Sequence, residues 1–222
     1  MTGRGPMPNR GNLSDDCMVF IVDDDPIVRG AIGALLLSVG RQVRLFESAT
    51  DLMQTSLPAV PSCLVLDIRL PGLSGLDLQA ELANAGLSLP IIFITAYGDI
   101  PMSVRAMKAG AIDFLTKPFR DQDLLDAVTR ALERDRKRRN SEKDILHLRV
   151  NFSSLTPREK QIMALVTDGL LNKQIAARTG ISDVTTKIHR GRVMKKMGAK
   201  SLADLVIMAE ALGVRGKLPE GT

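Results

Sequence analysis

The fold of this chain is decided by the stretch Leu64-Val65-Leu66-Asp67-Ile68-Arg69-Leu70-Pro71-Gly72. The apolar run from Cys63 to Leu66 predicts a short, fully buried strand, which ends on a carboxylate followed at once by turn residues. In open α/β sheets, ligands bind outside the carboxyl ends of the parallel strands, where Asp67 would lie. The stretch therefore predicts a functional site at Asp67, provided that neighbouring strands bring further polar groups to the same edge.

Four more short apolar runs predict strands, and helical patterns alternate with them. These strands are expected at residues 18–22, 43–46, 91–94 and 112–116. Helices are expected to begin at Pro26, near Ser48, at 75, at 101 and near 121. The alternation predicts a five-stranded, doubly wound parallel sheet. No Gly-rich phosphate loop follows the first strand, which argues against a nucleotide-binding fold.

Polar side chains follow several of these strands at the point where each strand ends. They are Asp23, Asp24, Asp67, Thr95 and Lys117. Three carboxylates at one edge repel each other unless a cation lies among them, and Mg²⁺ (or Mn²⁺) prefers such oxygen ligands. Together with an ammonium and a hydroxyl, the metal would suit a phosphoryl group that Asp67 attacks as nucleophile. The alternative is that solvated acids merely cap the strand ends.

Composition divides the chain into an acidic and a basic part. The 222 residues allow two domains, and the net charge is +5. Residues 1–133 hold 11 Lys+Arg against 16 Asp+Glu, whereas residues 151–222 hold 12 against 6. The second part is therefore expected to meet a polyanion.

The ends and the cysteines of the chain indicate its compartment. Met1 to Asp16 lacks a hydrophobic centre, so we expect a disordered tail rather than a signal peptide. No apolar run approaches the roughly 20 residues of a membrane-spanning helix. Cys17 and Cys63 are expected to be buried thiols, which fits a reducing, cytoplasmic compartment without membrane partners.

A helix-turn-helix is predicted after a charged linker. Residues 135–152 are expected to form the linker, which is either a continuing helix or a flexible tether, with helix favoured because Gly and Pro are absent until Pro157. Four helices are expected in residues 153–214: one from Leu155, one at 173–178, one at 183–197, and one from Ser201 to Leu212. Residues 215–222 would be a tail. Two helices joined by a tight Gly-containing turn, the second rich in cations, describe a helix-turn-helix.

The predicted helix 183–197 has an apolar stripe and a basic stripe. Thr186, Val193 and Met197 share the first, where the Thr186 hydroxyl needs a partner such as a carbonyl one turn back. The second stripe contains Lys187, Ile188, Gly191 and Lys195. It is expected to contact DNA together with the flanking residues Arg190, Arg192 and Lys196. Cations reach phosphates or base edges, and small or apolar groups contact thymine methyls. A basic surface helix without a ligand is the alternative.

The first part, residues 17–134, resembles the receiver domain of two-component response regulators. The matching motifs are Val22-Asp23-Asp24, Leu66 to Gly72, Thr95-Ala96 and Lys117-Pro118-Phe119. The resemblance implies that a histidine kinase phosphorylates Asp67 while Asp23, Asp24, Asp67 and the backbone carbonyl of Arg69 hold Mg²⁺. It also implies phosphoryl contacts from Thr95 and Lys117, a switch formed by Thr95 and Phe114, and a cis bond before Pro118.

The second part resembles the LuxR-type DNA-binding domain. The matches are Leu155 to Glu159, Asn172 to Ala176, Thr185 to Arg190 and Met197 to Ser201. By this resemblance Lys173 and Thr185 join the expected DNA contacts, and the helix 201–212 supplies a dimer contact.

Together the two parts resemble a response regulator of the NarL/FixJ class. The resemblance implies a transcription factor that is not an enzyme, although its receiver would assist its own phosphotransfer and dephosphorylation. Its partners would be a histidine kinase, double-stranded promoter DNA and, on activation, a second copy of the chain, with RNA polymerase as a further candidate. One alternative is a constitutive DNA-binding protein with a non-signalling receiver. The other is an aspartyl-phosphate phosphohydrolase, which would need a general acid where the sequence has Arg69.

Overall fold

The computed structural model describes residues 17–96 and 98–216. The expected disordered tail 1–16, Tyr97, and the end of the expected tail 215–222 lie outside the described residues. The described chain forms two compact units, one reaching to Arg139 and the other beginning at Asn140. No helix in the described part of the chain is long and apolar enough to cross a membrane.

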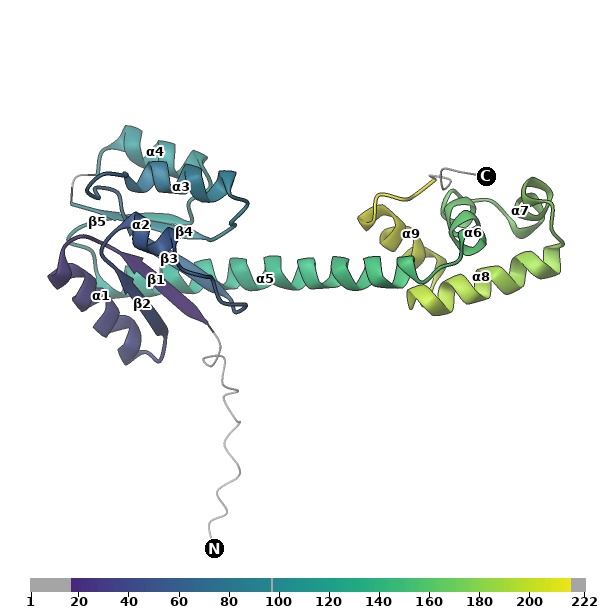
Figure 1. The fold of residues 1–222 in the computed structure, drawn as a ribbon, viewed down its shortest axis with the longest axis horizontal. Helices are drawn as coiled ribbons and strands as arrows, with labels where there is room; N and C mark the ends of the chain where they lie inside the picture. The colour runs from purple at the N-terminus through teal and green to yellow at the C-terminus, as the bar shows by residue number, and fades with distance from the viewer. Residues whose placement is uncertain (1–16, 97, 217–222) are drawn as a thin grey trace, which may run out of the picture. The chain divides into compact units, whose positions relative to one another are not determined.

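In the first unit, the described strands form one parallel sheet in the order β2-β1-β3-β4-β5 (Figure 1). The strands are β1 (Met18–Val22), β2 (Gln42–Phe46), β3 (Ser62–Asp67), β4 (Ile91–Thr95) and β5 (Asp113–Thr116). All of β3 and β4 is buried, because both faces of a parallel sheet are covered by helices. The doubly wound, five-stranded parallel sheet predicted from the sequence is therefore confirmed.

Helices pack on both faces of the sheet and produce two apolar cores. The helices of this unit are α1 (Pro26–Ser38), α2 (Ala49–Met53), α3 (Gly75–Asn84), α4 (Ile100–Lys108) and the first part of α5 (Asp121–Ser153). Residues of α2, α3 and α4 share one core with Phe20, Leu64 and Phe93. Residues of α1 and α5 share the other with Ile21 and Val65. Neighbouring residues on each strand thus alternate between the two cores.

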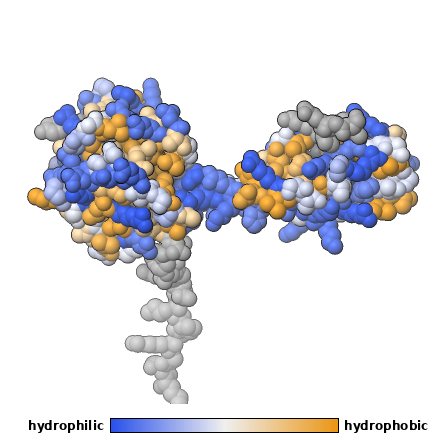
Figure 2. All heavy atoms as spheres, in the orientation of Figure 1, coloured by the Kyte–Doolittle hydropathy of each residue, from blue (hydrophilic) through white to orange (hydrophobic). Residues whose placement is uncertain are grey.

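A buried carboxylate fastens α5 to the amino-terminal end of β3. Asp135 is fully buried and accepts hydrogen bonds from the Ser62 backbone N–H at 2.9 Å, from Arg138 Nη2 at 2.6 Å and from Arg139 Nε at 2.6 Å. A buried charge is tolerated when it is paired and hydrogen-bonded in this way. Beyond this point α5 continues as one helix through the expected linker to Ser153, and hydrophilic residues cover its middle (Figure 2).

Within residues 140–216, the second unit contains helices and no strands. Its helices are α6 (Pro157–Thr167), α7 (Asn172–Thr179), α8 (Asp183–Met197) and α9 (Leu202–Ala211), together with the end of α5. Thr156 caps α6 with a capping box: its hydroxyl accepts from the Glu159 N–H, and the Glu159 carboxylate accepts from the Thr156 N–H. Gly180 and Gly198 end α7 and α8 in left-handed backbone conformations. Ile162, Val193 and Leu205 meet in the core. The predicted all-α second domain is confirmed.

Candidate functional site

The carboxyl edge of the sheet gathers the predicted phosphorylation-site residues. Val22 pairs with Leu66, Asp67 with Ile94, and Thr95 with Thr116. The residues at or just after these strand ends are therefore neighbours. Asp23 and Thr95 are fully buried, Asp67 is 7% exposed, and Asp24 is exposed.

Lys117 bridges two of the acids. Its Nζ lies 2.7 Å from Asp23 Oδ2 and 2.6 Å from Asp67 Oδ2. Burial raises the pKa of Asp23 above its ordinary value, more than the hydrogen bond from Lys117 lowers it. Burial also opposes the charge of Lys117, but the hydrogen bonds to Asp23 and Asp67 raise the pKa of its ammonium above the ordinary value. An added positive charge would therefore stabilise the buried carboxylates at this edge of the sheet.

The geometry of the acids fits a divalent cation. Asp23, Asp24 and Asp67 each offer a carboxylate oxygen, and these three oxygens lie within 4.8 Å of one another. Oxygens around one octahedral Mg²⁺, each at about 2.1 Å from the ion, lie about 3 to 4.2 Å apart, so the three carboxylates are near enough to share one ion after their side chains adjust. The Arg69 N–H donates to Asp67 Oδ1 at 2.9 Å, whereas the predicted metal contact of its carbonyl oxygen stays a prediction.

Close backbone contacts hold the acids in place. The Asp25 N–H donates to Asp23 Oδ1 at 3.0 Å, and the Asp25 side chain caps α1. Gly75 begins α3 against β3: its N–H donates to the Ile68 carbonyl, and an added Cβ would lie 2.5 Å from the Asp67 carbonyl oxygen. The Lys117–Pro118 bond is cis, as expected.

The two residues of the predicted switch lie on adjacent strands. Thr95 ends β4, and Phe114 on β5 is half-buried and pairs with Phe93. Sequence reasoning missed Gly98, at which an added Cβ would come within 2.8 Å of the Phe114 ring. The only sequence signal for this position is a glycine three residues after Thr95. The sequence does not show that the Phe114 ring packs against this glycine.

The candidate DNA-binding surface is the exposed side of α8. Thr186, Val193 and Met197 are buried as predicted, and the Thr186 hydroxyl donates to the Ser182 carbonyl at 3.1 Å, one turn back. Lys187, Ile188, Gly191, Arg192 and Lys195 are exposed, and so is Lys173 on α7. Thr185 is half-buried beside the Ser182 hydroxyl. Figure 2 shows mainly hydrophilic residues along the visible side of α8.

Two of the cationic residues predicted to contact DNA have partners within the domain. Arg190 Nη1 donates to Asn172 Oδ1 at 3.1 Å. Lys196 Nζ donates to Glu159 Oε2 at 2.6 Å and to the Ser154 carbonyl at 3.1 Å. Glu159 is 3% exposed, so its buried negative charge is stabilised by the ion pair with Lys196. No local sequence pattern indicates this pair between residues 37 positions apart.

Glu159→Gln is expected to destabilise the second unit by about 2 kcal/mol at neutral pH, because Lys196 loses its buried ionic partner. Burial opposes the charge of Glu159, but Lys196 and the Thr156 N–H hold its pKa below the ordinary value. Its contribution is therefore present above the unfolded pKa and is lost as the pH falls through the lower, folded pKa. Urea unfolding of the full chain, followed by NMR methyl signals of Ile162 and Val193, measures the change.

Glu210→Gln is the matched control, since Glu210 pairs with Arg215 at the surface. It should change the free energy of unfolding by less than about 0.5 kcal/mol. Equal effects of the two substitutions at neutral pH would show that the buried pair with Lys196 contributes nothing.

Comparisons with known proteins identify both domains. Residues 19–129 match the family model for the response regulator receiver domain, and residues 153–209 match the model for bacterial regulatory proteins of the luxR family. Nodulation protein W of Bradyrhizobium diazoefficiens is 54% identical, with 100% of this chain and 99% of the relative covered.

Two solved structures extend the similarity across the chain. The response regulator StyR is 48% identical, with a TM-score of 0.79 over 88% of this chain and 99% of that one. Full-length FixJ from B. japonicum is 38% identical, with a TM-score of 0.51 over 88% of this chain and 97% of that one. The chain belongs to the response regulators of the NarL/FixJ class, in which a receiver domain is followed by a LuxR-type DNA-binding domain, and it is a transcriptional regulator.

Proposed function

We propose that a partner histidine kinase phosphorylates Asp67 in a magnesium-dependent step, and that this modification promotes dimerisation and promoter binding. The observation that carries the proposal is the cluster at the sheet edge, where Lys117 lies within 2.7 Å of both Asp23 and Asp67 and Asp24 completes a set of metal-binding oxygens. Kinase and promoter would meet the protein in the cytoplasm.

Several side chains of this chain would each have a separate role in the phosphoryl transfer. Asp23, Asp24, Asp67 and the Arg69 carbonyl would hold Mg²⁺, which neutralises charge on the phosphoryl oxygens. An Asp67 oxygen attacks phosphorus, so that an O–P bond forms while the N–P bond of the donor phosphohistidine breaks and the leaving imidazole keeps the electron pair and takes a proton. Lys117 exchanges its bond to Asp67 Oδ2 for one to a phosphoryl oxygen. The Thr95 hydroxyl donates to another, and the change reaches Phe114 on the next strand.

An apolar groove beside this site suits the kinase. It has a volume of about 660 Å³ and lies between α1 and the loop that follows β5. Its lining includes Ile27, Val28, Lys117, Pro118 and Phe119. Ile27 is 81% exposed, so a helical partner could bury it while presenting a phosphohistidine to Asp67.

Exposed apolar residues on two helices support dimerisation. Ile100, Val104 and Met107 are exposed on α4, and Leu202 and Ile207 are exposed on α9. A two-fold dimer would bury these residues and place two copies of α8 on half-sites related by the dimer axis. RNA polymerase is a further candidate partner at the promoter.

The two alternatives differ in what happens to phosphate. A phosphohydrolase would need a general acid two residues after Asp67, where Arg69 stands. We propose instead that the chain turns over no external substrate and acts only on its own phosphoryl group. A constitutive DNA-binding protein would take up no phosphate.

Incubation of the full chain with acetyl phosphate tests the proposal. With Mg²⁺, intact-mass spectrometry should find a single added phosphoryl group, and EDTA should abolish the addition. DNA fragments selected with the unmodified chain should then bind more tightly after phosphorylation. Uptake that is insensitive to EDTA, or equal DNA affinity of both forms, would refute the proposed gating.

A further inference from the structure

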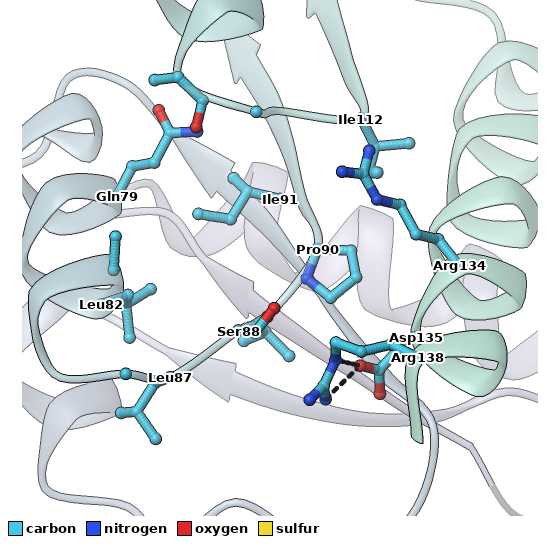
Figure 3. A pocket seen from close by; sticks show the side chains of 15 residues that line it. Gln79, Leu82, Leu87, Ser88, Pro90, Ile91, Ile112, Arg134, Asp135 and Arg138 are labelled. Carbon is cyan, nitrogen blue, oxygen red and sulfur yellow. Dashed lines mark hydrogen bonds and ion pairs between the residues drawn. The ribbon is translucent and has the colours of Figure 1, made fainter. Parts of the chain in front are cut away.

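A second concave site lies at the opposite end of the sheet from Asp67. It is a pocket of about 600 Å³ between the carboxyl ends of α3 and α4, the start of β4, and α5 (Figure 3). Its volume is within the range of about 300–1,000 Å³ that small-molecule sites occupy. All of its lining residues belong to the first unit.

One wall of the pocket is cationic. Arg134 and Arg138 stand one turn apart on α5, and Figure 3 shows Arg134 reaching toward Ile112 while Arg138 turns back onto Asp135. Asp135 is already satisfied by the Ser62 N–H, Arg138 and Arg139. Within residues 17–96 and 98–216, the Arg134 guanidinium has no hydrogen bond or ion pair. The cationic wall therefore presents one positive charge without a protein partner among those residues, that of the exposed Arg134.

The facing wall is mainly apolar, but Gln79 adds a buried side-chain oxygen that has no hydrogen-bond partner among the described residues. Leu82, Leu87, Pro90 and Ile91 line this wall, and Leu87 is 39% exposed toward solvent. The Ser88 side chain adds a hydroxyl. A ligand that fills this space must place an apolar body against the leucines and a negative group against α5.

We propose that this pocket binds a small organic carboxylate with an apolar or aromatic body, so that the receiver domain has a chemical input separate from Asp67. Arg134 would pair with the carboxylate through its fork of N–H donors. A phosphate ester fits less well, because its second charge would require more donors than one unpaired arginine supplies. The site does not depend on the proposed phosphorylation.

The probe is 2-naphthoate, with uncharged 2-naphthamide as its matched analogue. Methyl NMR of the full chain should show saturable shifts at Leu87, Ile91 and Ile112, with the amide binding roughly tenfold more weakly. Arg134→Gln should weaken 2-naphthoate binding by roughly tenfold, because the charge-assisted pair is lost. Lys137→Gln, a neighbouring exposed lysine that does not line the pocket, should stay within about twofold of the wild type.

Two further variants test the apolar wall of the pocket and the independence of the pocket from Asp67. Leu87→Ser removes a half-exposed wall residue without disturbing the core and should also weaken binding. Asp67→Asn should bind 2-naphthoate as the wild type does, which separates this site from phosphorylation. Absence of shifts at about 10 mM probe, shifts confined to the α1 groove at Ile27 and Ile32, or wild-type affinity of Arg134→Gln would each overturn the proposal.

Discussion

The Asp67→Asn protein is expected to take up no phosphoryl group from acetyl phosphate and Mg²⁺, whereas the wild type takes up one. Asparagine keeps the shape of the side chain, but its neutral amide is not a nucleophile for phosphorus. The carboxylate at this position lies 2.6 Å from the Lys117 ammonium and belongs to the acid set that fits a metal. Intact-mass spectrometry of both proteins measures the difference, which should be complete.

Asp77→Asn is the control for this loss. Asp77 lies in the first turn of α3, where its carboxylate accepts from the Ser74 hydroxyl at 2.6 Å, outside the acid cluster. This variant should be phosphorylated like the wild type. Rapid release of phosphate from many small substrates would instead favour the phosphohydrolase, and a wild type without uptake would favour the constitutive DNA-binding protein. If the Asp67→Asn protein still took up a phosphoryl group, another residue would have to be the acceptor.

Lys117→Met is expected to lower the free energy of unfolding of the first unit by about 3 kcal/mol in the absence of divalent metal. The Lys117 side chain is 17% exposed and pairs with two acids whose side chains are 0% and 9% exposed, so its removal leaves buried carboxylates facing each other. Mg²⁺ should recover much of this loss and should bind more tightly than in the wild type, because no ammonium competes for the oxygens.

Urea unfolding of the full chain with and without Mg²⁺, followed by the methyl signals of Val22 and Leu66, measures both effects. Lys108→Met is the matched control, because Lys108 is an exposed lysine of α4 far from the acids in sequence. It should change stability by less than about 0.5 kcal/mol, with no dependence on Mg²⁺. A Lys117→Met protein as stable as the wild type in EDTA would contradict the electrostatic account of the cluster.

Local patterns in the sequence predicted most of the fold and the elements of both sites. The alternation of apolar runs and helical patterns gave the strand positions, since a buried parallel strand needs only a short apolar run. The stripe of Thr186, Val193 and Met197 was predictable because helical periodicity alone places them on one side of α8. Four strand ends with polar groups indicated one site because parallel strands end at the same edge.

Contacts between distant segments could not be predicted in this way. Asp135 looked like one charge among many in the linker, yet it is buried against Ser62, 73 residues earlier. Lys196 looked like part of a basic stripe, yet it neutralises Glu159. The pocket beneath Arg134 draws its walls from four elements. Periodicity describes one helix or strand, whereas these features depend on which elements the fold brings together.

The close contact between Gly75 and the end of β3 restricts movement of the loop that follows Asp67. The Gly75 backbone packs directly on Asp67 and Ile68, without an intervening side chain to absorb movement. A displacement of Asp67 would therefore move the first turn of α3 by a similar amount, because no flexible side chain separates the two segments. Any residue with a Cβ at position 75 would consequently clash with the backbone of Asp67 and Ile68 unless the loop changes its conformation.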